Sequence, residues 1–113
     1  MVKIEAIIQP FKLEDVKTTL ETLCIEEFTI SEVVAHGGPV ANKAFFRGAE
    51  YRVEVPMLRL EMLVSSRRAD EVIEALSRAA STTIPGDDGT IRVYELADAV
   101  RIRTRERLEF ALP

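Results

Sequence analysis

Residues 2–24 read VKIEAIIQPFKLEDVKTTLETLC, and the period of their apolar residues changes once within this stretch. Apolar and polar residues alternate at first and then become apolar, which is typical of a half-buried strand. Beyond Pro10 the apolar residues follow helical spacing as far as Cys24. We therefore expect a strand over residues 2–9, followed by an amphipathic helix that buries Cys24 in the core.

The same two periods recur along the rest of the chain. β-branched and apolar runs indicate strands, and apolar residues three and four apart indicate a second helix. The expected elements are, in order, strands over 28–36 and 52–64, a helix over 69–80 capped by Ser65 or Ser66, a strand over 90–95, a helical turn near 96–100 and a strand over 101–104.

The long strand over 52–64 contains Pro56, and its apolar residues move there from odd to even positions. A shift of one residue reverses the two faces of a strand unless an extra residue is absorbed. We therefore expect a bulge or bend, with Pro56 on an unpaired edge. The whole pattern predicts an α+β, ferredoxin-like βαββαβ sandwich with a long loop, a short C-terminal strand and both helices on one face of the sheet.

Length and composition exclude several classes of protein. The 113 residues fit a single domain over 1–113. The net charge of −4 provides no global basic field for nucleic acid. One cysteine rules out a disulfide framework and fits a reducing compartment. Since no apolar run approaches the roughly 20 residues of a membrane span, we expect no membrane insertion and a cytoplasmic location.

Glycines and arginines are grouped in ways that suit phosphate. The glycine pairs are Gly37-Gly38 and Gly86 with Gly89, and backbone N–H groups in such turns can converge on an anion, although ordinary surface turns use the same residues. In a terminal strand, Arg101, Arg103 and Arg105 would share one face. Guanidinium groups suit phosphate oxygens, whereas a charged edge strand is the alternative interpretation.

The stretch from Gly37 to Tyr51 has no regular pattern, and loops of this length are usually functional or mobile. Its aromatic residues beside Arg47 favour docking into a partner protein over a disordered insertion. His36 is the single histidine, so one chain cannot form a multi-histidine metal site. Among the dispersed acidic residues, Glu61 could take part in a site, with a salt bridge as the alternative.

Two motifs together resemble a known family. Phe46-Arg47-Gly48-Ala49-Glu50-Tyr51 is similar to the T-loop signature of PII signal-transduction proteins (nitrogen regulatory protein P-II), with Phe46 where tyrosine is usual. Arg101-Ile102-Arg103-Thr104 resembles the C-terminal signature of this family, and the resemblance covers nearly the whole chain.

The resemblance implies a non-enzymatic homotrimer that binds ADP, AMP or ATP in clefts between subunits. Its T-loop, about residues 37–52, would contact a target transporter or enzyme. The B-loop would lie at about 81–90 and the C-terminal segment at about 96–113. For this chain we expect no tightly bound cofactor and no metal site.

Residue roles are carried over by position. Tyr51 matches the position that some members modify by uridylylation. The residues that would contact the partner are Phe45, Phe46, Arg47, Gly48, Ala49, Glu50 and Tyr51. The residues that would bind nucleotide are Ile7, Thr29, His36, Gly37, Gly38, Leu63, Gly86, Asp87, Asp88, Gly89, Thr90, Arg101 and Arg103.

The chain also departs from the family pattern. Pro39 replaces a glutamine that would help to hold Mg²⁺ and 2-oxoglutarate, and Met57 replaces a lysine that would pair with the 2-oxoglutarate carboxylate. Because a buried dianion needs such partners, we expect no 2-oxoglutarate sensing and doubtful Mg²⁺ binding. Bicarbonate or another small anion in inorganic-carbon regulation is an attractive second ligand. The B-loop lacks two lysines and gains an aspartate, so ADP or AMP should bind at least as well as ATP.

Other functions fit the residues less well. A standard nitrogen regulator that responds to ATP and 2-oxoglutarate remains an alternative, as does a CutA-like or structural trimeric domain. An acylphosphatase-like enzyme would need a phosphate loop that Gln9–Lys12 does not supply and a positioning asparagine, and Asn42 is the single asparagine. An RNA-binding module would need aromatic residues on the central strands.

Overall fold

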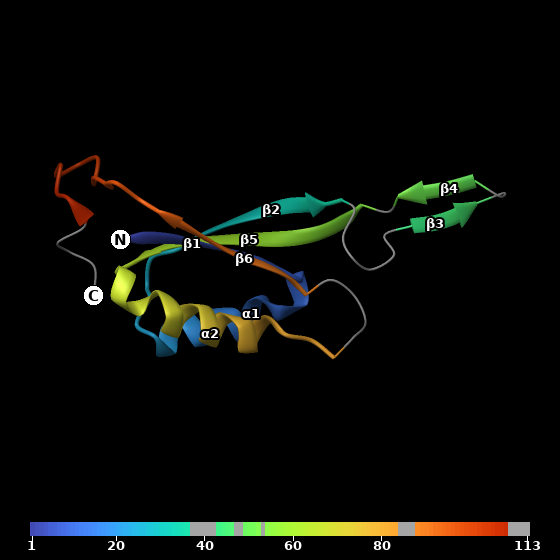
Figure 1. Ribbon diagram of the computed structural model, residues 1–113, viewed down its shortest axis with the longest axis horizontal. Helices are drawn as coiled ribbons and strands as arrows, with labels where there is room; N and C mark the ends of the chain where they lie inside the picture. Colours follow the sequence, from blue (N-terminus) through green and yellow to red (C-terminus); the bar gives the residue numbers. More distant parts are fainter. Residues whose placement is uncertain (37–42, 47–48, 53, 84–87, 109–113) are drawn as a thin grey trace.

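A computed structural model describes residues 1–36, 43–46, 49–52, 54–83 and 88–108, with the backbone alone for 43–46 and 49–52. The main sheet has four antiparallel strands in the order β2-β5-β1-β6. Both helices lie against one face of this sheet, and the other face carries none (Figure 1). This arrangement confirms the ferredoxin-like α+β fold. The elements of this layered unit are β1 (Val2–Ile8), α1 (Leu13–Thr22), β2 (Thr29–Ala35), β5 (Val55–Val64), α2 (Ala69–Ala80) and β6 (Gly89–Glu95).

Short 3-10 turns lead into both helices. Pro10 begins the first, η1 (Pro10–Lys12), where its missing N–H removes no helical hydrogen bond. The second, η2 (Ser66–Arg68), lies between Ser65 and α2, so the expected serine cap is wrong. The Ser65 side chain makes no capping hydrogen bond, and the Ser66 hydroxyl accepts one from the N-terminal ammonium instead.

The hydrophobic core lies between the helices and the sheet. Even-numbered residues of β1 and β5 face each other across the strand pair, as in Ile4 opposite Met62 and Ala6 opposite Leu60. Val16 and Leu20 of α1 and Val72 and Leu76 of α2 cover them. Burial of each large side chain stabilises the fold by about 1.5–3 kcal/mol. The fully buried side chains at the centre are Ile4, Ile8, Val16, Leu20, Leu60, Val72 and Leu76.

β5 continues through Pro56 without a bulge, so this part of the expectation is wrong. Its register with β2 is unbroken and pairs Pro56 with Val34. Pairing with β1 begins only at Leu58, so the side of Pro56 toward β1 is unpaired, as expected. The apolar positions change because Met57 is buried on the helix-free face, whereas Leu60 and its even-numbered neighbours are buried under the helices.

A second, two-stranded sheet lies within the stretch that showed no regular pattern. β3 (Lys43–Phe46) pairs antiparallel with β4 (Ala49–Arg52), and the hairpin projects beyond the ends of β2 and β5 (Figure 1). The absence of regular structure was therefore a wrong expectation for these strands. These two strands pair through their backbones and lie apart from the main sheet. A hairpin that does not cover the core needs no alternation of apolar residues, so periodicity did not reveal it.

The segment after β6 also differs from the expectation. Residues 96–99 form no helical turn, and the expected strand over 101–104 is a turn. Only an isolated bridge joins Val100 to Arg107. Among the described residues, no helix is long and apolar enough to cross a membrane.

Candidate functional site

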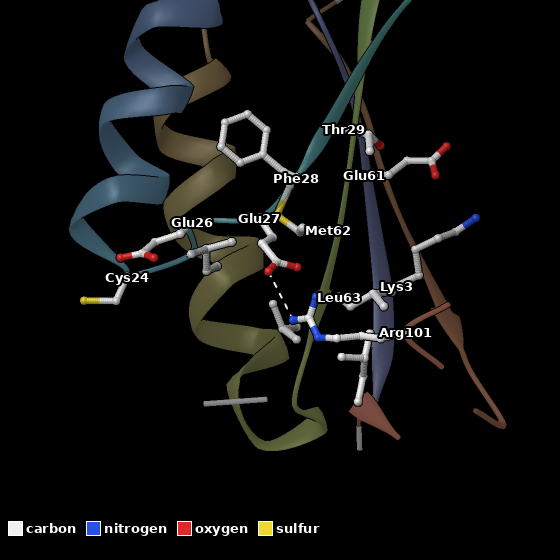
Figure 2. Close-up of a pocket in the computed structure, with 13 residues that line it drawn as sticks. Lys3, Cys24, Glu26, Glu27, Phe28, Thr29, Glu61, Met62, Leu63 and Arg101 are labelled. Carbon is white, nitrogen blue, oxygen red and sulfur yellow. Dashed lines mark hydrogen bonds and ion pairs between the residues drawn. The ribbon is translucent and has the colours of Figure 1, made fainter. Parts of the chain in front are cut away.

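A cavity lies where β1 begins and β5 ends, beside Arg101 and Leu108 of the C-terminal segment, and Figure 2 shows the residues that line it. Its volume is about 850 Å³, which is enough for a small organic ligand. We call it the Arg101 cavity. Its lining residues are Lys3, Cys24, Ile25, Glu26, Glu27, Phe28, Thr29, Glu61, Met62, Leu63, Val64, Arg101 and Leu108.

One wall of the Arg101 cavity comes from the connection between α1 and β2. Cys24 has a φ of 60°, and the N–H of Ile25 donates to the carbonyl of Leu20 at 2.9 Å. The chain therefore turns sharply after the helix and brings Glu26 and Glu27 to the cavity. Cys24 is exposed and lies outside α1, so its expected place in the core is wrong. Helical spacing extends to this residue, but the helix ends at Thr22.

The opposite wall holds Arg101. One of its terminal nitrogens, Nη2, donates to Oε1 of Glu27 at 3.1 Å, and Figure 2 shows the guanidinium extending across the end of the sheet toward that carboxylate. The backbone of Arg101 is tied into the turn, since its N–H donates to Glu106 and its carbonyl accepts from Arg105. The turn therefore presents this guanidinium to the cavity.

The three alternating arginines do not share a strand face. Arg105 has a φ of 60°, and Arg103 is exposed within the turn and does not line the Arg101 cavity. The expectation of a common face rested on a strand, and the turn replaces that strand. Of these arginines, the cavity receives only Arg101.

Other charged groups around the Arg101 cavity have their own contacts. The ammonium of Lys3 lies 4.6 Å from the centre of the Tyr94 ring. Glu61 pairs with Arg59 at 3.1 Å, which confirms the salt-bridge alternative, and it also lines the cavity. Lys3 and the two glutamates of the α1–β2 connection were not expected here. The signal in the sequence that could have pointed to these glutamates is that two carboxylates stand side by side just before a strand.

A second cavity of about 360 Å³ lies where β6 begins, and we call it the Gly89 cavity. Four expected nucleotide-binding residues line it, namely Ile7, Asp88, Gly89 and Thr90. Gly89 has a φ of 100°, and a Cβ atom there would lie 1.7 Å from the carbonyl oxygen of Ile7. This position therefore requires glycine, because β1 and β6 approach each other too closely for any side chain.

The expected nucleotide-binding residues thus fall into two groups. Thr29, Leu63 and Arg101 line one cavity, and the four residues above line the other. β6 separates the groups: its seven residues, at about 3.3 Å each, place Gly89 about 20 Å from Glu95, where the C-terminal segment begins. Within one chain, the described residues of the two groups are therefore too far apart to contact the same phosphate chain.

His36 stands apart from both cavities. Its Nε2 lies 3.2 Å from Oε1 of Glu54, so the pair joins the end of β2 to the residue before β5. Among the described residues, no group of three or more histidine, cysteine or acidic side chains could hold a metal ion.

Some expected site residues lie outside the described residues, namely Gly37, Gly38, Arg47, Gly48, Gly86 and Asp87. Phe45 and Phe46 lie in β3, and Ala49, Glu50 and Tyr51 lie in β4, where only the backbone is described.

Comparisons with known proteins agree on one family. The family model described as "Nitrogen regulatory protein P-II" matches residues 1–106. Proteins of that name from Haemophilus influenzae and Pasteurella multocida are 43% and 42% identical over 113 residues, covering 99% of this chain and 100% of each relative. "Nitrogen regulatory protein GlnK" of Escherichia coli K12 is 41% identical over 110 residues, covering 96% of this chain and 97% of that protein.

Proposed function

The chain belongs to the nitrogen regulatory protein P-II family, as the sequence motifs indicated, and from that premise we propose that it is a regulator that binds adenine nucleotide between subunits. Proteins of this family are regulatory signal transducers that form trimers, bind nucleotides and interact with target proteins.

The observation that carries the proposal is the separation of the two residue groups. A phosphate chain is too short to contact both Arg101 and the turn at Gly89 of one chain, because Gly89 begins β6, Arg101 follows its other end, and the strand is about 20 Å long. A site between subunits removes the difficulty, because the Arg101 cavity of one chain can meet the Gly89 cavity of its neighbour. Exposed apolar side chains on the two edge strands, Ile30 and Val34 of β2 and Val93 and Tyr94 of β6, support association of subunits.

We propose that ADP or AMP binds at least as well as ATP. Three carboxylates line the Arg101 cavity, those of Glu26, Glu27 and Glu61, and Asp88 lines the other half of the site. Each added phosphate charge would approach these carboxylates, with Lys3 and Arg101 as the cations of the first cavity.

We also propose that 2-oxoglutarate is not a ligand. Met57 stands where the lysine for its carboxylate would be, and this side chain is only 2% exposed. A buried thioether cannot pair with a dicarboxylate, whereas a monoanion such as bicarbonate needs fewer charged partners. The target protein would contact the segment that includes β3 and β4, with Tyr51 as a site of modification, and a cytoplasmic location belongs to the same proposal.

A standard nitrogen regulator that responds to ATP and 2-oxoglutarate is the second candidate. The printed names of the relatives favour it, since each is a nitrogen regulatory protein. The two candidates differ in nucleotide preference and in the second ligand.

Calorimetric titration tests both candidates. We expect measurable binding of ADP and AMP, Mg-ATP that binds no tighter, and no effect of 2-oxoglutarate. Arg101→Ala should weaken ADP binding about ten- to a hundredfold, because it removes a charge-assisted contact. Arg107→Ala is the matched control, since Arg107 lies in the same segment and pairs with Asp98 outside the cavity. Tight Mg-ATP binding that 2-oxoglutarate strengthens would favour the second candidate.

A further inference from the structure

We propose that Glu27 is a specificity-determining residue that competes with phosphate for Arg101. The inference rests on the nucleotide site proposed above and concerns what occupies that site when no nucleotide is bound. The Glu27 carboxylate accepts a hydrogen bond from the Arg101 guanidinium at 3.1 Å, and both side chains line the same cavity. A phosphate that binds Arg101 must displace this carboxylate or share the guanidinium with it.

The location and exposure of the Glu27–Arg101 ion pair suit competition with phosphate better than a role in stabilising the fold. Glu27 lies in the connection before β2, outside any helix or strand, and its side chain is 75% exposed. The side chain of Arg101 is 42% exposed. Exposed ion pairs contribute little to folding, because water solvates both charges when they separate. The carboxylate can therefore leave the guanidinium without unfolding the wall of the cavity.

Arg101 is the cation of the cavity for which phosphate and Glu27 compete. The lining residues include two cations, Lys3 and Arg101, against three carboxylates. Lys3 lies over the Tyr94 ring, and Glu61 pairs with Arg59. Glu26 is next to Glu27 and lines the cavity as well, but Glu27 is the carboxylate paired with Arg101.

Competition of this kind discriminates among nucleotides by charge. The guanidinium fork binds carboxylate and phosphate oxygens through the same N–H groups, so the two anions cannot both be fully bound. A displaced Glu27 carboxylate stays close to the cavity and repels the incoming phosphates. This repulsion increases with each phosphate, and therefore penalises ATP more than AMP.

Glu27→Gln tests the proposal, because glutamine keeps the size of the side chain and removes its charge. The matched control is Glu26→Gln, which removes a neighbouring charge from the same cavity. Calorimetric titrations would use AMP, ADP and ATP with both variants, with Arg101→Ala and with the double variant Glu27→Gln/Arg101→Ala. Thermal unfolding would verify that each variant folds.

We expect Glu27→Gln to tighten AMP binding about two- to fivefold, with a larger gain for ADP and ATP than for AMP. Glu26→Gln should give a smaller gain. The gain should shrink in about 1 M salt, where charges are screened beyond about 3 Å. In the double variant it should disappear, because Arg101 is then absent.

Four results would overturn the inference. Equal gains in Glu27→Gln and Glu26→Gln would mean that only the general field of the cavity matters. A gain that persists without Arg101 would mean that Glu27 acts through another group. If the unmodified protein binds nucleotide and Glu27→Gln changes nothing, the inference fails alone. If the unmodified protein and every variant bind no nucleotide, the proposed function fails with it.

Discussion

The two faces of the main sheet are built from the same strands and differ in how many charged side chains they carry. On the face under the helices, Ile4 of β1 lies opposite Met62 of β5, and both are buried and apolar. On the helix-free face, Glu5 lies opposite Glu61, so two carboxylates are neighbours across the strands. One face supplies the hydrophobic free energy of folding, and the other carries charges that can be used for binding.

Like charges directly opposite each other destabilise a sheet unless each has a partner. Here Arg92 of β6 pairs with Glu5 at 3.3 Å, and Arg59 pairs with Glu61 at 3.1 Å. Arg59 also donates to the hydroxyl of Ser31 on β2 at 3.1 Å. On the helix-free face these contacts join β6 to β1 and β5 to β2, and the Arg59–Glu61 pair lies within β5, whereas the other face is held by packing.

The largest effect is expected from the helix-covered face. Leu60→Ala should lower the free energy of unfolding by about 2–5 kcal/mol, because Leu60 is fully buried and alanine leaves a cavity. Urea denaturation at one protein concentration would measure the loss. Leu63→Ala is the control on the same strand, since Leu63 is only partly buried and faces the other side. Equal losses for the two variants would contradict the division between the faces.

An intermediate effect is expected from the helix-free face. Arg92→Ala should cost about 1–3 kcal/mol of unfolding free energy, because it takes the guanidinium away from Glu5, which is only 6% exposed. The double variant Glu5→Gln/Arg92→Ala should lose less stability than Arg92→Ala, since it also removes the buried charge. Chemical denaturation of both variants would measure this order. A double variant less stable than the single one would refute the explanation.

The smallest effect is expected outside both faces. Glu74 and Arg78 form an exposed ion pair one turn apart on α2, with side chains 66% and 78% exposed. Glu74→Ala should change the unfolding free energy by less than about 0.5 kcal/mol. Melting temperatures of the variant and the parent protein would test this, and a loss as large as that of Arg92→Ala would mean that surface charge pairs matter as much as those on the sheet.

Periodicity predicted the elements that bury one face, and it did so for a physical reason. β1, β5 and both helices place apolar residues at regular intervals because each packs against the core. Elements without a core face gave a weaker signal. Periodicity did not predict the β3–β4 hairpin. The alternating arginines over 101–104 led to the prediction of a strand where the structure has a turn.

The candidate site was predicted only in part. The sequence signatures selected Thr29, Leu63 and Arg101, which the fold brings to one cavity, and Ile7, Gly89 and Thr90, which it brings to another. Glu27 was not expected at the site. No local pattern could have assigned it to Arg101, because 74 residues separate the two in the chain.

The amino-acid sequence by itself determined the family, the order of the main strands and helices and most of the residues that form the core. These properties follow from local hydrophobic spacing and from short motifs, and both can be recognised in the sequence without knowledge of the fold. Only the tertiary structure decided that Pro56 interrupts nothing, that Cys24 is exposed and that Arg101 meets Glu27. Each of these depends on strand register or chain reversal, and both are set by contacts between residues far apart in the sequence.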